Sequence, residues 1–181
     1  MKKLFQSKIT LIVLLVTLFS LGVEGQTSSM KVYNKHGLYF TYPSTYTIEE
    51  EIDDDGMLSL TCEINGSDFS QIVMTLFANN LLTLLDSDDK MEMCKTSLEA
   101  MRDELKANSM FEQAKCGPIQ PCQIAGSHAY QASMTNELLG ISMNGKLMAV
   151  AKGDKLVTIV TLYENDNYKR ALEEIIQSLK L

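Results

Sequence analysis

The chain has 181 residues, of which 45% are hydrophobic and 22% are charged, and its formal net charge is −7. This composition is able to fill a core, which excludes an intrinsically disordered chain, and ten glycines with three prolines exclude collagen-like and Gly/Pro-rich classes. The length favours one domain. Composition alone therefore describes an ordinary acidic globular protein and predicts no activity.

The first 25 residues are predicted to be a cleaved secretory signal peptide. Lys2, Lys3 and Lys8 precede residues 9–21, which are almost all apolar but too few for a membrane span of about 20 residues. Gly25 provides a small residue before the expected cleavage site. An uncleaved anchor helix is the alternative. We therefore expect a periplasmic or secreted protein with no stable membrane insertion after cleavage.

Cleavage would make the chain more acidic. The leader removes three lysines and one glutamate, which leaves 13 basic and 22 acidic residues and a net charge of −9. Nucleic-acid binding needs clustered Lys and Arg, but Arg102 and Arg170 are the only arginines in the sequence. The charge also argues against docking on anionic lipid headgroups.

The first half of the exported chain is predicted to begin with a flexible arm at residues 26–35 and to continue as strands. Apolar residues alternate from Leu38 to Tyr42, and the alternation resumes after Pro43 as far as Ile52. Turn signals at residues 53–56 and 65–66 separate two further alternating runs, residues 58–64 and 72–78. We expect these three runs to form an antiparallel meander.

A helix is predicted to follow a loop at residues 79–88, which has one helical turn at Leu81–Leu85. Asp89 and Glu92 resemble a capping box. Apolar residues then recur at spacings of three and four, which places them on one helix face. They are Met91, Cys94, Leu98, Met101 and Leu105. The pattern fades near Asn108, and residues 111–125 are predicted to be an irregular connection.

The remaining chain is predicted to form further strands and a terminal helix. Residues 130–134 alternate, and Asn144-Gly145 is the strongest hairpin signal in the chain. Residues 156–162 are apolar on both faces apart from threonines, which indicates a central strand covered on both sides. Leu172, Ile175, Ile176 and Leu179 have helical spacing. We expect an α+β domain with an antiparallel sheet of about six to seven strands and two main helices packed against it.

The four cysteines, Cys62, Cys94, Cys116 and Cys122, all lie in the exported part. An oxidising compartment favours disulfides, and four cysteines permit three connectivities. Cys62 and Cys94 lie on the apolar faces of their elements and would point into one interface if that helix packs on that sheet. Cys116 and Cys122 flank a bend with two prolines, which can bring their Cα atoms within disulfide reach. Free buried thiols are an alternative. A redox or metal role is another, although C-x5-C is not the spacing of thioredoxin-like enzymes.

No other pattern predicts a catalytic residue, a metal ligand or a cofactor. Met91 and Cys94 share a helix face that would suit Cu(I), but they belong to the core stripe. The acidic run 49–55 fails the EF-hand spacing because Gly56 falls at position 4 of the loop. Ser127-His128 lacks the Gly-x-Ser-x-Gly elbow of a nucleophilic serine.

Two segments and the order of elements carry a family resemblance. Residues 37–43 (GLYFTYP) and 175–181 (IIQSLKL) resemble the opening strand and the closing helix of the PsbP-like superfamily. That group includes an extrinsic photosystem subunit, a Ran-binding nuclear factor and exported bacterial proteins, and the exported branch is the most similar. The resemblance spans residues 36–181, which we take as one domain. It implies a sheet with packed helices and a binding or accessory role.

The leading hypothesis is therefore an exported, non-enzymatic binding or accessory protein of the cell envelope with a protein partner. Tyr33, Tyr39 and Tyr163 would contribute to its interface. The alternative is a small-ligand or lipid-binding protein with a pocket between sheet and helix. Met101, Met134 and Met148 would line that pocket. An enzyme is the third and least supported hypothesis. The sequence shows no pair of acid and base side chains at a defined spacing.

Overall fold

The computed structural model describes residues 29–67, 69–108, 111 and 113–181. The predicted signal peptide at residues 1–25 lies outside the described residues, and so do residues 26–28 of the predicted arm. Within the described ranges, no helix is both long and apolar enough to cross a membrane.

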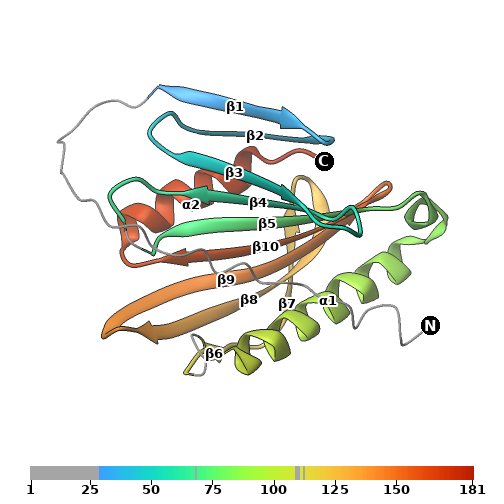
Figure 1. Cartoon of the computed structure of the whole chain (residues 1–181). Helices are drawn as coiled ribbons and strands as arrows, with labels where there is room; N and C mark the ends of the chain where they lie inside the picture. The colour runs from blue at the N-terminus through green and yellow to red at the C-terminus, as the bar shows by residue number, and fades with distance from the viewer. Residues whose placement is uncertain (1–28, 68, 109–110, 112) are drawn as a thin grey trace.

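An eight-stranded antiparallel sheet forms the body of the protein (Figure 1). Its strand order is β3-β4-β5-β10-β9-β8-β6, and β7 also pairs with β8. The expected α+β class and antiparallel sheet are confirmed, with one strand more than the upper expectation. The strands are β3 (Thr47–Ile52), β4 (Leu58–Glu63), β5 (Gln71–Ala78), β6 (Lys115–Cys116), β7 (Gln120–Ile124), β8 (Ser127–Leu138), β9 (Ile141–Lys152) and β10 (Lys155–Tyr163).

The two helices cover opposite faces of this sheet, so the protein has two cores. Helix α1 (Ser87–Ala107) packs on β9, β8 and β10, whereas α2 (Asp166–Ser178) contacts β10 on the other side. The predicted central strand is β10, between β5 and β9. Its residues alternate between the cores, because Val157 and Ile159 join the cluster of α2 while Leu156 and Leu162 join that of α1. Strand β10 therefore has buried side chains on both faces, as its composition predicted.

A separate two-stranded sheet occupies the place of the expected arm and of the first predicted strand. Strand β1 (Met30–Lys35) pairs with β2 (Leu38–Pro43), so the expectation of a flexible arm is wrong for residues 30–35. Tyr33 stacks on Phe40 with ring centroids 4.8 Å apart, and both are buried in the core of α2. The stacked rings explain why a short polar segment is ordered. The meander itself is β3-β4-β5, without β2.

The start of α1 differs from the prediction by three residues. Asp86, not Asp89, is the N-cap, and its carboxylate accepts hydrogen bonds from the amides of Asp88 and Asp89 at 2.9 Å. The 3₁₀ helix η1 (Asn80–Leu84) confirms the expected helical turn in the preceding loop. The predicted apolar stripe is confirmed where it meets the sheet. Its buried residues are Cys94, Leu98, Met101 and Leu105, while Met91 is half-buried.

The predicted hairpin at Asn144-Gly145 is wrong, because both residues lie inside β9. The turn between β8 and β9 is Leu139-Gly140, and both residues have positive φ, as a type I′ turn requires. Gly145 serves a different purpose in the strand, since a Cβ there would collide with the carbonyl oxygen of Thr161 on β10. This glycine allows β9 and β10 to approach each other closely, and it provides no turn.

Replacement of Gly145 by alanine should therefore destabilise the fold. The added methyl group must displace the backbone of the central strand, and we expect a loss of roughly 1–3 kcal/mol in the free energy of unfolding. Urea denaturation followed by circular dichroism measures it. Ser142→Ala, at an exposed position of the same strand, is the control and should change little. A Gly145→Ala midpoint equal to that of the control would contradict this account of the glycine.

Candidate functional site

No disulfide joins the four cysteines in the structure, and both pairs expected from the sequence are separated. Cys62 on β4 belongs to the core of α2, whereas Cys94 belongs to the core of α1. The sheet lies between these cores. The argument that α1 packs on the apolar face of β4 is therefore wrong, and it no longer supports a Cys62–Cys94 bond.

Cys116 and Cys122 are also apart. Cys116 on β6 pairs with Met134 of β8, and Cys122 on β7 pairs with Ala129 of the same strand. Five residues of β8 correspond to about 17 Å, and an odd number of residues places the two side chains on opposite faces of the sheet. Disulfide formation needs Cα atoms within about 7 Å. The segment between the two cysteines, which contains both prolines, connects β6 to β7, and these two strands pair with different parts of β8.

Burial keeps the thiols protonated. Desolvation, with a smaller effect of Glu63, raises the pKa of Cys62 to about 12, and desolvation raises that of Cys94 to about 11. The pKa values of Cys116 and Cys122 are raised by burial as well, although Arg102 and Lys106 oppose this at Cys116. Because the thiolate is the reactive form, none of these cysteines has the environment of a catalytic nucleophile.

The metal-binding alternatives considered from the sequence are not supported by a cluster of ligands in the described part of the chain. No group of three or more His, Cys, Asp or Glu side chains is placed there to hold a metal ion. In the acidic run, Asp53 caps its own turn, because its carboxylate accepts hydrogen bonds from the amides of Asp55 and Met57. That arrangement is the ordinary chemistry of an Asx turn.

The methionines proposed to line a pocket do not surround one space. Met101 and Met134 are buried in the core of α1, and Met148 is buried in the core of α2 on the other side of the sheet. Of the three tyrosines expected at an interface, Tyr33 is buried, while Tyr39 and Tyr163 are half-buried. These residues therefore belong to packing and define no common site.

The feature that sequence reasoning missed is the half of the sheet that α1 leaves open. In the view of Figure 1, α1 lies along β8 and β9, and no described helix lies in front of β3, β4 and β5. We call this surface the uncovered face. Strand alternation, together with the observed register, places twelve residues of β3, β4, β5 and the middle of β10 on it. They are Thr47, Glu49, Glu51, Ser59, Thr61, Glu63, Gln71, Val73, Thr75, Phe77, Thr158 and Val160.

Cross-strand pairing arranges the residues of this face in rows, and the burial of the side chains changes gradually along each row. One row runs Glu51, Ser59, Thr75, Thr158, and its neighbour runs Glu49, Thr61, Val73, Val160. Beyond β10 the rows continue beneath α1, where Leu147 and Ala149 are fully buried. Along each row, side chains are therefore buried beneath α1, half-buried on β10, β5 and β4, and exposed on β3.

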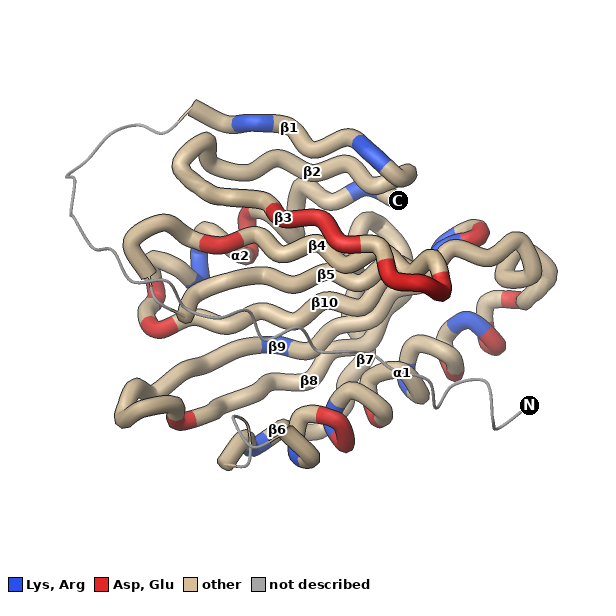
Figure 2. The backbone as a smooth tube through the Cα atoms, viewed as in Figure 1, with Lys and Arg blue, Asp and Glu red and all other residues tan. Residues whose placement is uncertain are grey.

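The outer edge of the uncovered face is acidic, and Figure 2 shows the acidic residues following β3 into its turn. Glu49 and Glu63 are diagonal neighbours on β3 and β4, since Glu49 pairs with Thr61. Burial, followed by the charge of Glu49, raises the pKa of Glu63. Among the described residues, no ion pair involves Glu49, Glu51 or Glu63. Three carboxylates therefore gather at this edge, and none of them is paired with a cationic side chain of residues 29–67, 69–108, 111 or 113–181.

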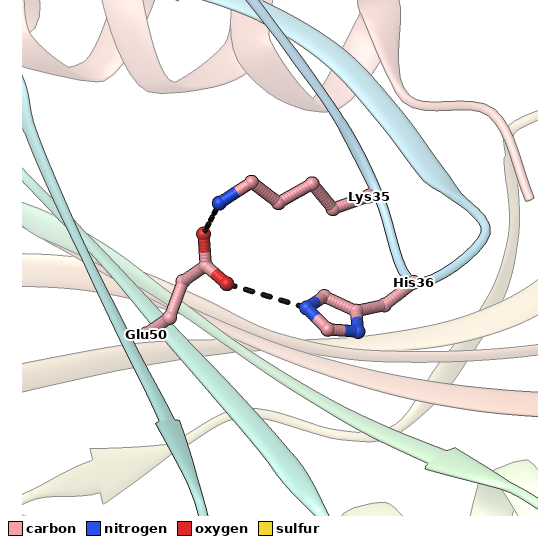
Figure 3. A network of polar contacts seen from close by, with 3 residues as sticks. All are labelled: Lys35, His36 and Glu50. Carbon is pink, nitrogen blue, oxygen red and sulfur yellow. Dashed lines mark hydrogen bonds and ion pairs between the residues drawn. The ribbon is translucent and has the colours of Figure 1, made fainter.

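Glu50, which points to the other face of β3, has two partners (Figure 3). Its carboxylate is 2.7 Å from Lys35 Nζ and 3.3 Å from His36 Nε2, at the end of β1 and in the turn that follows. The hydrogen bond from Lys35, assisted by His36, lowers the pKa of Glu50. Burial and the charge of Glu50 raise the pKa of Tyr33 to about 12. This contact ties the two-stranded sheet to β3.

Comparison with solved structures supports the expected fold. No protein-family model and no curated protein matches the chain. The solution structure of cyanobacterial PsbP (CyanoP) from Synechocystis superposes with a TM-score of 0.55 at 12% identity, covering 91% of this chain and 98% of that one. A crystal structure from Bacteroides thetaiotaomicron gives 0.51 at 14% identity, covering 86% of this chain and 48% of that one. The chain thus has a PsbP-like fold.

Thiol counting tests the state of the cysteines. Because all four are thiols in the structure, we expect four alkylation adducts by intact mass after denaturation without reductant. In the folded protein, half-buried Cys116 and Cys122 should react before buried Cys62 and Cys94. A sample denatured with reductant is the control for complete labelling. Two adducts without reductant and four with it would show a disulfide and contradict the expectation.

The Glu50 contact predicts a pH-dependent contribution to stability. A lowered carboxyl pKa stabilises the fold above the unfolded value of about 4.3, and this contribution is lost as pH falls through the folded value. Glu50→Gln should cost a few tenths of a kcal/mol at pH 7, since the pair is partly exposed, and nothing near pH 2. Urea denaturation at several pH values measures it. Glu49→Gln, without a cationic partner, should lack this loss; a pH-independent cost at Glu50 would contradict the account.

Proposed function

We propose that this PsbP-like chain is a non-enzymatic binding protein and that the uncovered face is the surface on which it holds a protein partner. The observation that carries the proposal is the incomplete coverage of the sheet by α1. It leaves a patch of regular strands in which side-chain positions are set by register. A rigid, preorganised surface loses little conformational entropy on association.

The composition of the face suits a protein interface. Val73, Phe77 and Val160 are half-buried apolar residues, of which Phe77 and Val160 pack against the core of α1, and a partner would remove their remaining surface from water. Ser59, Thr61 and Thr75 lie between them and the glutamates, and their hydroxyls both donate and accept hydrogen bonds. An apolar part beside a polar, charged rim is the usual anatomy of an interface.

The predicted signal peptide places the partner outside the cytoplasm. A leader at residues 1–25 would export the chain, and the proposed localisation is periplasmic or secreted. We accordingly propose an envelope protein, or a protein secreted to the same compartment, as the partner. The buried and protonated thiols are consistent with a binding role, since they offer no nucleophile.

Site-specific photocrosslinking in the native host tests this function. A photoreactive residue at Thr75, in the middle of the uncovered face, should give a discrete protein adduct of reproducible mass. The same residue at Thr135 is the matched control, because this exposed threonine of β8 lies on the opposite face of the sheet. The adduct should be lost when Val73→Arg is introduced beside the probe. No discrete adduct at Thr75, or equal adducts at both positions, would overturn the proposal.

A further inference from the structure

We infer that the partner segment bound by the uncovered face is basic at one end and apolar at the other, with Lys or Arg placed over Glu49, Glu51 and Glu63. This inference rests on the proposed function and adds the chemistry of the partner. It starts from the three consecutive glutamates of β3, which strand alternation distributes between two environments. Glu50 has Lys35 and His36 beside it, whereas Glu49 and Glu51 form no ion pair within the described part of the chain.

Burial, followed by the charge of Glu49, disfavours the ionised form of Glu63, so these two carboxylates repel each other at the edge of the uncovered face. Diagonal neighbours on antiparallel strands are close enough for their charges to interact. Accordingly, the charge of Glu49, after burial, contributes to the raised pKa of Glu63. A cation supplied by a partner would relieve this repulsion and form charge-assisted hydrogen bonds. The contrast with Glu50 on the same strand shows that the fold can pair a glutamate internally and does not do so at this edge.

The rows also give the size and polarity of the segment. Val73 and Val160 lie on β5 and β10, and Glu49 ends the same row on β3. From β10 to β3 there are three strand spacings, or about 14 Å. A segment lying across the strands would thus contact apolar side chains at one end and carboxylates at the other. The net charge of −9 expected for the exported chain would attract a basic partner and disfavours an anionic lipid surface.

Peptides of defined charge provide the probe. Three fluorescent peptides of equal length would carry the same apolar half, followed by lysines, glutamates or glutamines. We expect the lysine peptide to bind most tightly in an anisotropy titration, with an affinity that falls as salt is raised. Amide shifts on isotope labelling should map the bound peptide to β3, β4 and β5.

Two triple variants of the protein, each of which removes three negative charges, test where the lysines of the peptide bind. Glu49→Gln, Glu51→Gln and Glu63→Gln together should weaken the lysine peptide about tenfold at low salt. The matched control is Glu92→Gln, Glu99→Gln and Asp103→Asn, three exposed acids of α1, and it should leave the affinity within about twofold. Thr75→Arg should block binding sterically and electrostatically. Circular dichroism confirms that each variant is folded.

The outcomes separate this inference from the proposed function. Equal affinity of the three peptides, no binding of the lysine peptide, or an equal loss in both triple variants would overturn the basic partner. If photocrosslinking at Thr75 still yields a discrete adduct in that case, the uncovered face binds a partner of different chemistry and the proposed function stands. Loss of the Thr75 adduct together with these results would remove both.

Discussion

Burial of β10 on both of its faces is the constraint on which the rest of the structure depends. The strand pairs with β5 and β9 along its whole length, and its alternate residues enter two different cores. Apolar side chains on both faces require a covering layer on both sides. Helices α1 and α2 supply these layers, and Gly145 lets β9 approach β10 closely enough for the ladder to continue.

The two covering layers are unequal, and this inequality creates the surface to which we assign function. On one side, α2 is joined by the β1–β2 sheet, so residues from β2, β4, β5 and β10 share its core. On the other side, α1 covers mainly β8, β9 and β10 and leaves β3, β4 and β5 without a helix. The half-buried Phe77 and Val160, which pack against the core of α1, mark the boundary of its coverage.

Charge on β3 follows the same division between the two sides. Toward α2, Glu50 forms an ion pair with Lys35 and contacts His36, and this contact links the small sheet to β3. Toward the uncovered face, Glu49 and Glu51 meet no cation among the described residues, and Glu63 joins them. One strand thus uses a carboxylate for cohesion on one face and presents carboxylates to a partner on the other.

Local pattern determined much of the fold, whereas long-range packing decided its arrangement. The periodicity of residues 156–162 and of Cys94 to Leu105 correctly predicted a central strand and a buried helix face, because these signals depend only on spacing along one element. Asn144-Gly145 has the composition of a turn, yet both residues lie in β9, where Gly145 leaves room for the backbone of Thr161 on β10. Cys62 and Cys94 each showed a buried position, but the faces they occupy depend on which side of the sheet α1 packs. The uncovered face has no motif in the sequence, since it exists only where strand register and incomplete helix coverage bring four separate strands together.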